Sequence, residues 1–146
     1  MGPVPGQRDP MTRRSRSALI VSDSAPLRRY AAASLEAIRI VCTEAANGFQ
    51  AMDRLTEKAF ALYVLDLDMQ PSDGLAIFAV TLFGGYRDAS PVVIGYSGRA
   101  AGEQPRGAWP ADAEFAALLP KPFHPAELVM AAQRVLDSAE RDPSDL

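Results

Sequence analysis

Four polar residues that could do chemistry lie at the ends of short apolar runs in this chain. Asp23 follows residues 18–21, Asp66 comes near the end of 60–67, Ser97 follows 92–96 and Lys121 follows 116–119. Apolar runs of this length, bounded by turn residues, predict strands that are buried on both faces. Because ligands bind at the carboxyl ends of parallel strands, the four side chains are candidates for one common site.

The side-chain types at these strand ends fit metal-assisted phosphoryl transfer. Two nearby carboxylates repel each other unless a cation lies between them, and oxygen ligands without histidine or cysteine favour Mg²⁺. A lysine and a hydroxyl beside the metal can bind a phosphoryl group, and a carboxylate can be the nucleophile that forms an aspartyl-phosphate. Taken singly, Asp23 also fits a turn residue, Ser97 a strand-end hydroxyl and Lys121 a solvated charge.

The composition limits the class of protein. The chain has 146 residues, of which 48% are hydrophobic, and this predicts one globular domain. A net charge of −3 argues against a general nucleic-acid binder. The single cysteine, Cys42, is expected in the core, and a single histidine cannot build a histidine metal site. We find neither a membrane-spanning run nor the apolar segment of a signal peptide, so we expect a cytoplasmic location.

Strand and helix signals alternate along the chain and predict an α/β fold with a parallel sheet covered by helices on both faces. The expected strands are 18–21, 38–42, 60–67, 92–96 and 116–119. The expected helices are 25–37 with Ser24 as N-cap, 50–58 after an Asn47-Gly48 turn, 74–83 with Asp73 as N-cap, and 125–140. Residues 1–16 are expected to be a disordered or loosely attached extension, 17–140 the domain and 141–146 a polar tail.

Two helical regions are unusual. Residues 74–86 carry no charge, and the residues that can face the sheet are Leu75, Phe78, Ala79 and Leu82. Ile77, Val80 and Phe83 then lack an obvious core position, although a helix that is apolar all round should be buried. Their cover could be residues 99–114, or a second copy of the chain in a homodimer. Residues 99–114 contain two glycines and two prolines, which leave room for only a short fourth helix.

Taken in order, the motifs resemble the receiver domain of response regulators in bacterial two-component systems, from about residue 18 to 136. The matching segments are 21–29, 66–69 with 72–75, 92–98, and Lys121-Pro122-Phe123. The resemblance implies a flavodoxin-like, doubly wound fold with five parallel strands in the order 2-1-3-4-5. It also implies a cis bond between Lys121 and Pro122.

The resemblance assigns a role to each candidate residue. Asp66 would accept a phosphoryl group from a sensor histidine kinase or a phosphotransfer protein. Asp23 and Asp66 would bind the required Mg²⁺ through their carboxylates, and Asp68 through its backbone carbonyl. Ser97 and Lys121 would contact the phosphoryl group. The phosphoprotein would then signal through contact with a downstream protein, without enzymatic activity beyond self-catalysed phosphoryl transfer and dephosphorylation.

The chain departs from the family pattern in several places. Ser22 stands where the first of two acids is expected, and the Asp68 carboxylate could either compensate for that missing charge or repel an incoming phosphoryl group. Pro71 is one position later than the usual proline of this loop. Leu118 occupies the place of an aromatic residue that often relays the signal. Pro120 removes a hydrogen-bond donor from the fifth strand, which an edge strand tolerates.

Several functions stay open at this point. The favoured one is a single-domain response regulator, because few residues follow position 136. A second is a pseudo-receiver, a binding module that works without phosphorylation, as the missing acid at Ser22 would allow. A third is a phosphatase of the haloacid-dehalogenase type, whose Asp-x-Asp motif Asp66 and Asp68 resemble. That motif normally follows the first strand, however, and here it follows the third. A flavodoxin is disfavoured, because the first strand lacks a phosphate-binding loop.

Overall fold

The computed structural model describes residues 16–84, 91–98 and 109–140 of the chain, which form an α/β domain built on one five-stranded sheet. The strands are β1 (Ser17–Val21), β2 (Val41–Ala45), β3 (Leu62–Asp66), β4 (Val93–Ser97) and β5 (Ala117–Pro120). All neighbouring strands are parallel, in the order β2-β1-β3-β4-β5. The predicted fold and strand order are therefore confirmed, and Pro120 does lie in an edge strand.

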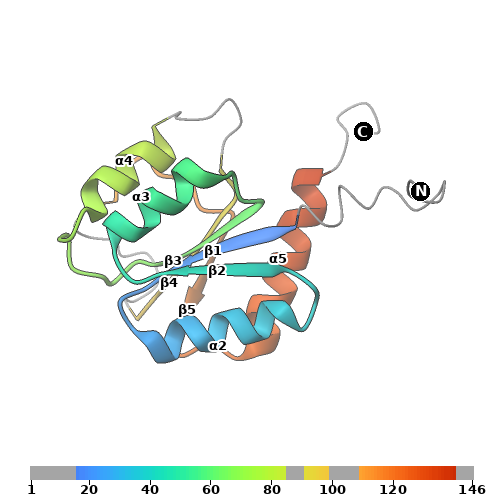
Figure 1. The fold of residues 1–146 in the computed structure, drawn as a ribbon. Helices are drawn as coiled ribbons and strands as arrows, with labels where there is room; N and C mark the ends of the chain where they lie inside the picture. Colours follow the sequence, from blue (N-terminus) through green and yellow to red (C-terminus); the bar gives the residue numbers. More distant parts are fainter. Residues whose placement is uncertain (1–15, 85–90, 99–108, 141–146) are drawn as a thin grey trace.

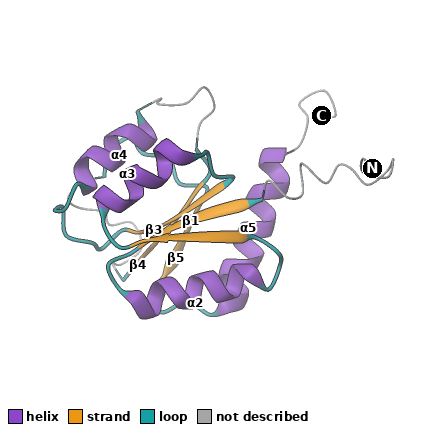
Figure 2. Ribbon diagram, in the orientation of Figure 1, coloured by secondary structure: helices purple, strands orange, loops and turns teal. Residues whose placement is uncertain are grey.

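Helices cover both faces of this sheet. Figures 1 and 2 show α3 (Gly48–Glu57) and α4 (Leu75–Phe83) on one face, and α2 (Ala25–Glu36) and α5 (Pro125–Glu140) on the other. Alternate residues of the central strands point into two separate cores. In β1, for example, Ile20 packs beneath α2 and α5, whereas Leu19 packs beneath α3 and α4. Because helices bury both faces of the sheet, the edge at which the strands end is the place where a functional site can lie.

The second strand lies three residues later than the predicted 38–42, and this prediction was wrong. The turn after α2 occupies this region, because the Arg39 backbone has a positive φ of 67°. The backbone N–H groups of Ile38 and Ile40 both donate to the carbonyl of Leu35 in this turn. Ile40 is buried against α2. Its apolar side chain therefore fits the pattern of a buried strand, although the residue does not belong to the sheet. Cys42 is half-buried, and burial raises the pKa of its thiol to about 12, so it behaves as packing rather than as a nucleophile.

The helix starts follow the predictions for α2 and α5 and differ for α3 and α4. Ser24 caps α2, since its side chain accepts a hydrogen bond from Leu27 N–H. Asn47 caps α3 instead of forming a turn with Gly48. Asp73 does not cap α4, because Asp73 and Gly74 both have positive φ, 54° and 81°, and the helix begins at Leu75. This backbone turn brings the Asp73 carbonyl to the N–H of Phe49, 2.9 Å away, and so joins the loop to α3.

Helix α4 is buried on the predicted side. Its residues in the core are Leu75, Phe78, Ala79 and Leu82. Phe83 packs edge-on against Trp109 and Phe115, with ring centroids 6.4 and 5.6 Å apart, so residues after the fourth strand do cover part of this helix. Ile77 and Val80 stay 60% and 62% exposed. Most of the expected fourth helix, 99–114, lies outside the described residues, and its described part, 109–114, is not helical.

The two ends of the described chain lie together. Arg16, the first described residue, pairs with Asp137 and Glu140 of α5 at 2.7 and 2.9 Å. Arg16 was expected to belong to a loose extension, and these ion pairs hold it against the domain instead. Within the described part of the chain, no helix is long and apolar enough to cross a membrane.

Candidate functional site

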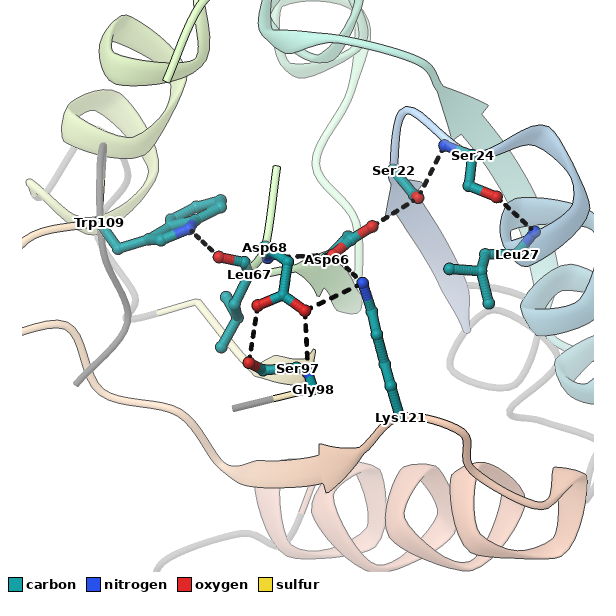
Figure 3. Close-up of polar contacts among 10 residues, drawn as sticks. All are labelled: Ser22, Ser24, Leu27, Asp66, Leu67, Asp68, Ser97, Gly98, Trp109 and Lys121. Atoms are coloured by element: carbon teal, nitrogen blue, oxygen red, sulfur yellow. Dashed lines mark hydrogen bonds and ion pairs between the residues drawn. The ribbon is translucent and has the colours of Figure 1, made fainter. Parts of the chain in front are cut away.

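The carboxyl edge of the sheet brings together polar residues from four strands. Asp66 is the last residue of β3, opposite Tyr96 of β4, and Ser97 is the last residue of β4. Ser22 directly follows β1, and Lys121 directly follows β5. Because these strands are parallel neighbours, their ends meet at one edge, where Figure 3 shows the side chains converging.

Asp66 lies at the centre of this cluster and is only 2% exposed. Its Oδ1 accepts hydrogen bonds from Lys121 Nζ at 2.7 Å and from the backbone N–H of Asp68 at 3.0 Å. Its Oδ2 accepts a hydrogen bond from the Ser22 hydroxyl at 2.8 Å. A buried carboxylate needs such partners, and the short contact with an ammonium is the strongest of them. The carboxylate is thus fixed in direction and paired with one cation.

Lys121 binds two carboxylates at once. Its Nζ lies 2.7 Å from Asp66 Oδ1 and 3.2 Å from Asp68 Oδ2, and 5.4 Å from the centre of the Tyr96 ring. Partial burial lowers the pKa of the ammonium, but the two carboxylates raise it more, so the pKa lies above its usual value. Lys121 is therefore a permanent positive charge at this edge. The peptide bond to Pro122 is cis, as the family resemblance implied.

Asp68 has a role that the sequence did not reveal. Its Oδ1 accepts the Ser97 hydroxyl at 2.8 Å, and its Oδ2 accepts the Gly98 backbone N–H at 2.8 Å. Burial raises the pKa of the Asp68 carboxyl. The two hydrogen bonds and Lys121 together lower it by more, so the pKa lies below its usual value. The sequence suggests a backbone-carbonyl role for Asp68 and a carboxylate that either compensates for Ser22 or repels a phosphoryl group, but not these hydrogen bonds to the end of β4. In the sequence, the one indication of this role is the spacing of two residues between Asp66 and Asp68, which places both side chains near the same edge of the sheet.

The end of β1 is built differently. Ser22 is fully buried, and its hydroxyl donates to Asp66 and accepts the N–H of Ser24 at 3.1 Å. Arg28 donates to the Ser22 carbonyl at 2.7 Å and pairs with Glu44 at 3.1 Å. Asp23 is exposed. A neutral hydroxyl therefore occupies the position where the family resemblance expects an acid.

The oxygen ligands at this edge can be compared with what Mg²⁺ requires. Among the described residues, no group of three acidic, histidine or cysteine side chains lies close enough to form a closed metal site. Mg²⁺ keeps several waters, however, and commonly takes only one or two carboxylates. By their chemical type, the carboxylates of Asp23 and Asp66 and the backbone carbonyl of Asp68 suit that smaller requirement, and the structure brings Asp66 and Asp68 together while Asp23 is exposed.

Two aromatic residues that sequence reasoning did not connect to the site support it from the two cores. Tyr96 is fully buried beside Asp66 and packs edge-on against Phe123 at 5.4 Å. Trp109 is buried on the other face and donates from Nε1 to the Leu67 carbonyl at 3.3 Å. Trp109 thereby holds the loop between Asp66 and Asp68 from the side of α4 (Figure 3).

The fold and the strand-end site define a doubly wound α/β protein with acidic residues and a lysine at the carboxyl edge of its sheet. Residues 18–133 match the family model described as the response regulator receiver domain. This match covers most of the chain, which therefore belongs to the receiver domain family. A search of curated proteins gives no match.

Solved structures of receiver domains share this fold. A CheY-like receiver protein from Methanospirillum hungatei aligns with a TM-score of 0.71 and 17% identity over 88% of this chain and 99% of its own. The chemotaxis response regulator CheY4 of Vibrio cholerae aligns with a TM-score of 0.68 and 21% identity over 82% and 97%. The N-terminal domain of a response regulator/sensory box/GGDEF protein from Carboxydothermus hydrogenoformans gives 0.68 and 15% over 85% and 96%.

Proposed function

We propose that this receiver domain accepts a phosphoryl group on Asp66 from a sensor histidine kinase or phosphotransfer protein and signals by contact with another protein. In this reaction a carboxylate oxygen of Asp66 forms a bond to phosphorus. The P–N bond of the donor phosphohistidine breaks, and its electron pair stays on the imidazole. The domain is a phosphoacceptor and not an enzyme acting on other substrates. A cytoplasmic location stays a prediction.

The observation that carries this proposal is the direction of the Asp66 carboxylate. Lys121 and the Asp68 N–H hold its Oδ1, and Ser22 holds its Oδ2, so the carboxylate is fixed at the strand end. Lys121 remains charged and can neutralise an equatorial oxygen of the arriving phosphoryl group, and the Ser97 hydroxyl can donate to another. A nucleophile fixed in this way requires little reorganisation of its own carboxylate during transfer.

The metal in this proposal is Mg²⁺, held by the carboxylates of Asp23 and Asp66 and the backbone carbonyl of Asp68. When bound, it supplies positive charge to the phosphoryl oxygens. Asp23 is exposed and follows Ser22 directly, so it would add a second negative charge beside the position from which Ser22 orients Asp66. With one acid fewer than the family pattern, the affinity for Mg²⁺ should be low.

Mass spectrometry of the intact protein tests the acceptor after incubation with acetyl phosphate and Mg²⁺. We expect one phosphoryl adduct on the wild type and on Asp53→Asn, a matched control that removes an exposed carboxylate from α3. Asp66→Asn should carry none. An adduct that persists in Asp66→Asn would show that another residue is the acceptor.

A second candidate is the pseudo-receiver, a binding module that does not require phosphorylation. The observation that favours it is that Asp66 already has protein partners on both carboxylate oxygens, with Ser22 in place of an acid, and that Asp68 already binds Ser97. Failure of the wild type to take up a phosphoryl group, in the mass measurement above, would favour this candidate.

We further propose that the exposed side of α4 is a contact surface, most simply in a two-fold homodimer. Ile77 and Val80 are exposed on a helix that carries no charged residue, and in the described structure nothing covers them. Sedimentation of the wild type should show dimers that Ile77→Glu/Val80→Glu abolishes. Met130→Glu is the control, because Met130 is equally exposed but lies on α5. A wild type that stays monomeric at high concentration would exclude the homodimer.

A further inference from the structure

The Asp68 carboxylate is held by more donors than a surface loop requires. Ser97 Oγ donates to one of its oxygens, and Gly98 N–H and Lys121 Nζ donate to the other, at 2.8, 2.8 and 3.2 Å. The side chain is still 30% exposed, so water could have satisfied it. Instead the ends of β4 and β5 close around it, as Figure 3 shows.

These three donors form a binding site for an anion. A hydroxyl, a backbone N–H and an ammonium are the groups that proteins use to bind phosphoryl oxygens. Two of them, Ser97 and Lys121, are the groups that the proposed function assigns to the phosphoryl group on Asp66. The same donors therefore serve the carboxylate in the structure and the phosphoryl group in the reaction.

The donors cannot serve both anions at full strength. The Ser97 hydroxyl and the Gly98 backbone have one proton each, and both protons point to Asp68. The Lys121 ammonium has three protons, of which Asp66 and Asp68 take two. Two anions on these groups would also repel each other at close range.

We propose that Asp68 is a built-in competitor, an internal anion that occupies the phosphoryl-binding groups and must leave them when Asp66 is phosphorylated. The contacts of Asp68 support its binding to these groups, whereas its effect on phosphorylation rests on the proposed function. Exchange of one anion for the other leaves Ser97, Gly98 and Lys121 satisfied in both states. Asp68 thereby slows phosphorylation. It also holds the Ser97 hydroxyl at the site before any phosphoryl group arrives.

Two measurements test the proposal on Asp68→Ala and Asp68→Asn. The first is hydrogen exchange of the Gly98 amide by nuclear magnetic resonance, which needs no phosphorylation. This amide should be protected in the wild type and should exchange about tenfold faster in Asp68→Ala, in line with the loss of a hydrogen bond to a charged group. The second is the rate of Asp66 phosphorylation by acetyl phosphate with Mg²⁺, which should rise about tenfold in Asp68→Ala.

The variants are chosen so that a folding defect does not confuse the result. Asp68→Asn keeps the shape of the side chain and removes the charge, so it should be phosphorylated faster than the wild type even if Asp68→Ala is poorly folded. Asp53→Asn removes an exposed carboxylate from α3 and should behave like the wild type in both measurements.

The outcomes separate this inference from the proposed function. A Gly98 amide that exchanges equally fast in the wild type and in Asp68→Ala would overturn the inference, as would unchanged phosphorylation rates in both Asp68 variants. If no variant takes up a phosphoryl group while Gly98 exchange responds to Asp68→Ala, the phosphoacceptor function fails and the anion-binding role of Asp68 is supported.

Discussion

The two ends of the site differ in where they carry negative charge. At the β1 corner, defined by Ser22, Asp23 and Arg28, the buried position is a neutral hydroxyl and the acid is exposed. At the β4 corner, defined by the Asp68 side chain with Ser97 and Gly98, a carboxylate is held by the strand end. Asp66 and Lys121 lie between the two corners: Asp66 accepts a hydrogen bond from Ser22 of the β1 corner, and Lys121 joins Asp66 to the Asp68 carboxylate of the β4 corner.

The comparison shows that a site can keep the same number of carboxylates while their positions in the site differ. By the family resemblance, an acid belongs at Ser22, beside the metal, and the β4 corner is left for a phosphoryl group. Here the β1 corner has one carboxylate fewer and the β4 corner has one more. Under the proposed function, this single shift would give a weaker metal site and a partly occupied phosphoryl site, and both can be tested by moving the charge back.

The largest effect is expected from Ser22→Asp, which returns an acid to the β1 corner. Ser22 is fully buried against Asp66, so two carboxylates would then face each other without a cation between them. We expect the free energy of unfolding without metal to fall by about 3 kcal/mol, and Mg²⁺ to restore most of it. Urea denaturation with a chelator and with Mg²⁺ measures both values.

Ser22→Asn is the control for this change, because it has nearly the same shape without the charge. It should be insensitive to the chelator. If Ser22→Asp is as stable without metal as Ser22→Asn, the β1 corner does not place its side chain against Asp66, and the comparison between the corners fails.

A double-mutant cycle on Lys121 should show which corner relies on it more. Lys121 is partly exposed in both ion pairs, but its partner Asp66 is buried and its partner Asp68 is 30% exposed. We expect a coupling energy of about 1–3 kcal/mol between Lys121→Met and Asp66→Asn, and of about 0–1 kcal/mol between Lys121→Met and Asp68→Asn. Urea denaturation of the single and double variants gives both values. Equal couplings would mean that Lys121 belongs to the β4 corner as much as to Asp66.

The fold and the ends of the strands could be predicted from the sequence, because each depends on local pattern and on chain order. Asp66, Ser97 and Lys121 follow apolar runs, and parallel strands bring such positions to one edge. The second strand was misplaced because Ile38 and Ile40 are not strand residues. They belong to a turn at Arg39, and their apolar side chains pack beneath α2. Only tertiary packing shows the difference.

The role of the Asp68 side chain could not be predicted for a related reason. Its orientation depends on donors from β4 and β5, which are 29 to 53 residues away in sequence. The same holds for Trp109, whose contact with the Leu67 carbonyl joins segments 42 residues apart. Spacing along the chain indicates which residues reach the edge, but the directions in which their side chains turn follow from the surrounding elements.

Trp109→Phe should have a smaller effect, confined to the β4 corner. The substitution removes the hydrogen bond to the Leu67 carbonyl and keeps an aromatic ring near Phe83. We expect a loss of about 0.5–1.5 kcal/mol in the free energy of unfolding. Amide chemical shifts of Asp68 and Gly98 should move, and those of Ser22 and Ser24 should not. Shifts that move equally at both corners would show that Trp109 supports the whole edge rather than one end.

The smallest effect is expected from Gly98→Ala, which keeps the backbone N–H that binds Asp68 and adds only a methyl group. A Cβ at this position would lie 3.6 Å from Asp68 Oδ2 and 3.9 Å from Lys121 Cβ, which are ordinary contact distances. The free energy of unfolding should therefore change by less than about 0.5 kcal/mol in urea denaturation. Gly48→Ala is the matched contrast, because its Cβ would lie 2.2 Å from the backbone of Gly74, so it should be strongly destabilising. If Gly98→Ala is as harmful as Gly48→Ala, the β4 corner is packed too tightly for Asp68 to leave it, and the exchange of anions proposed for this corner could not occur.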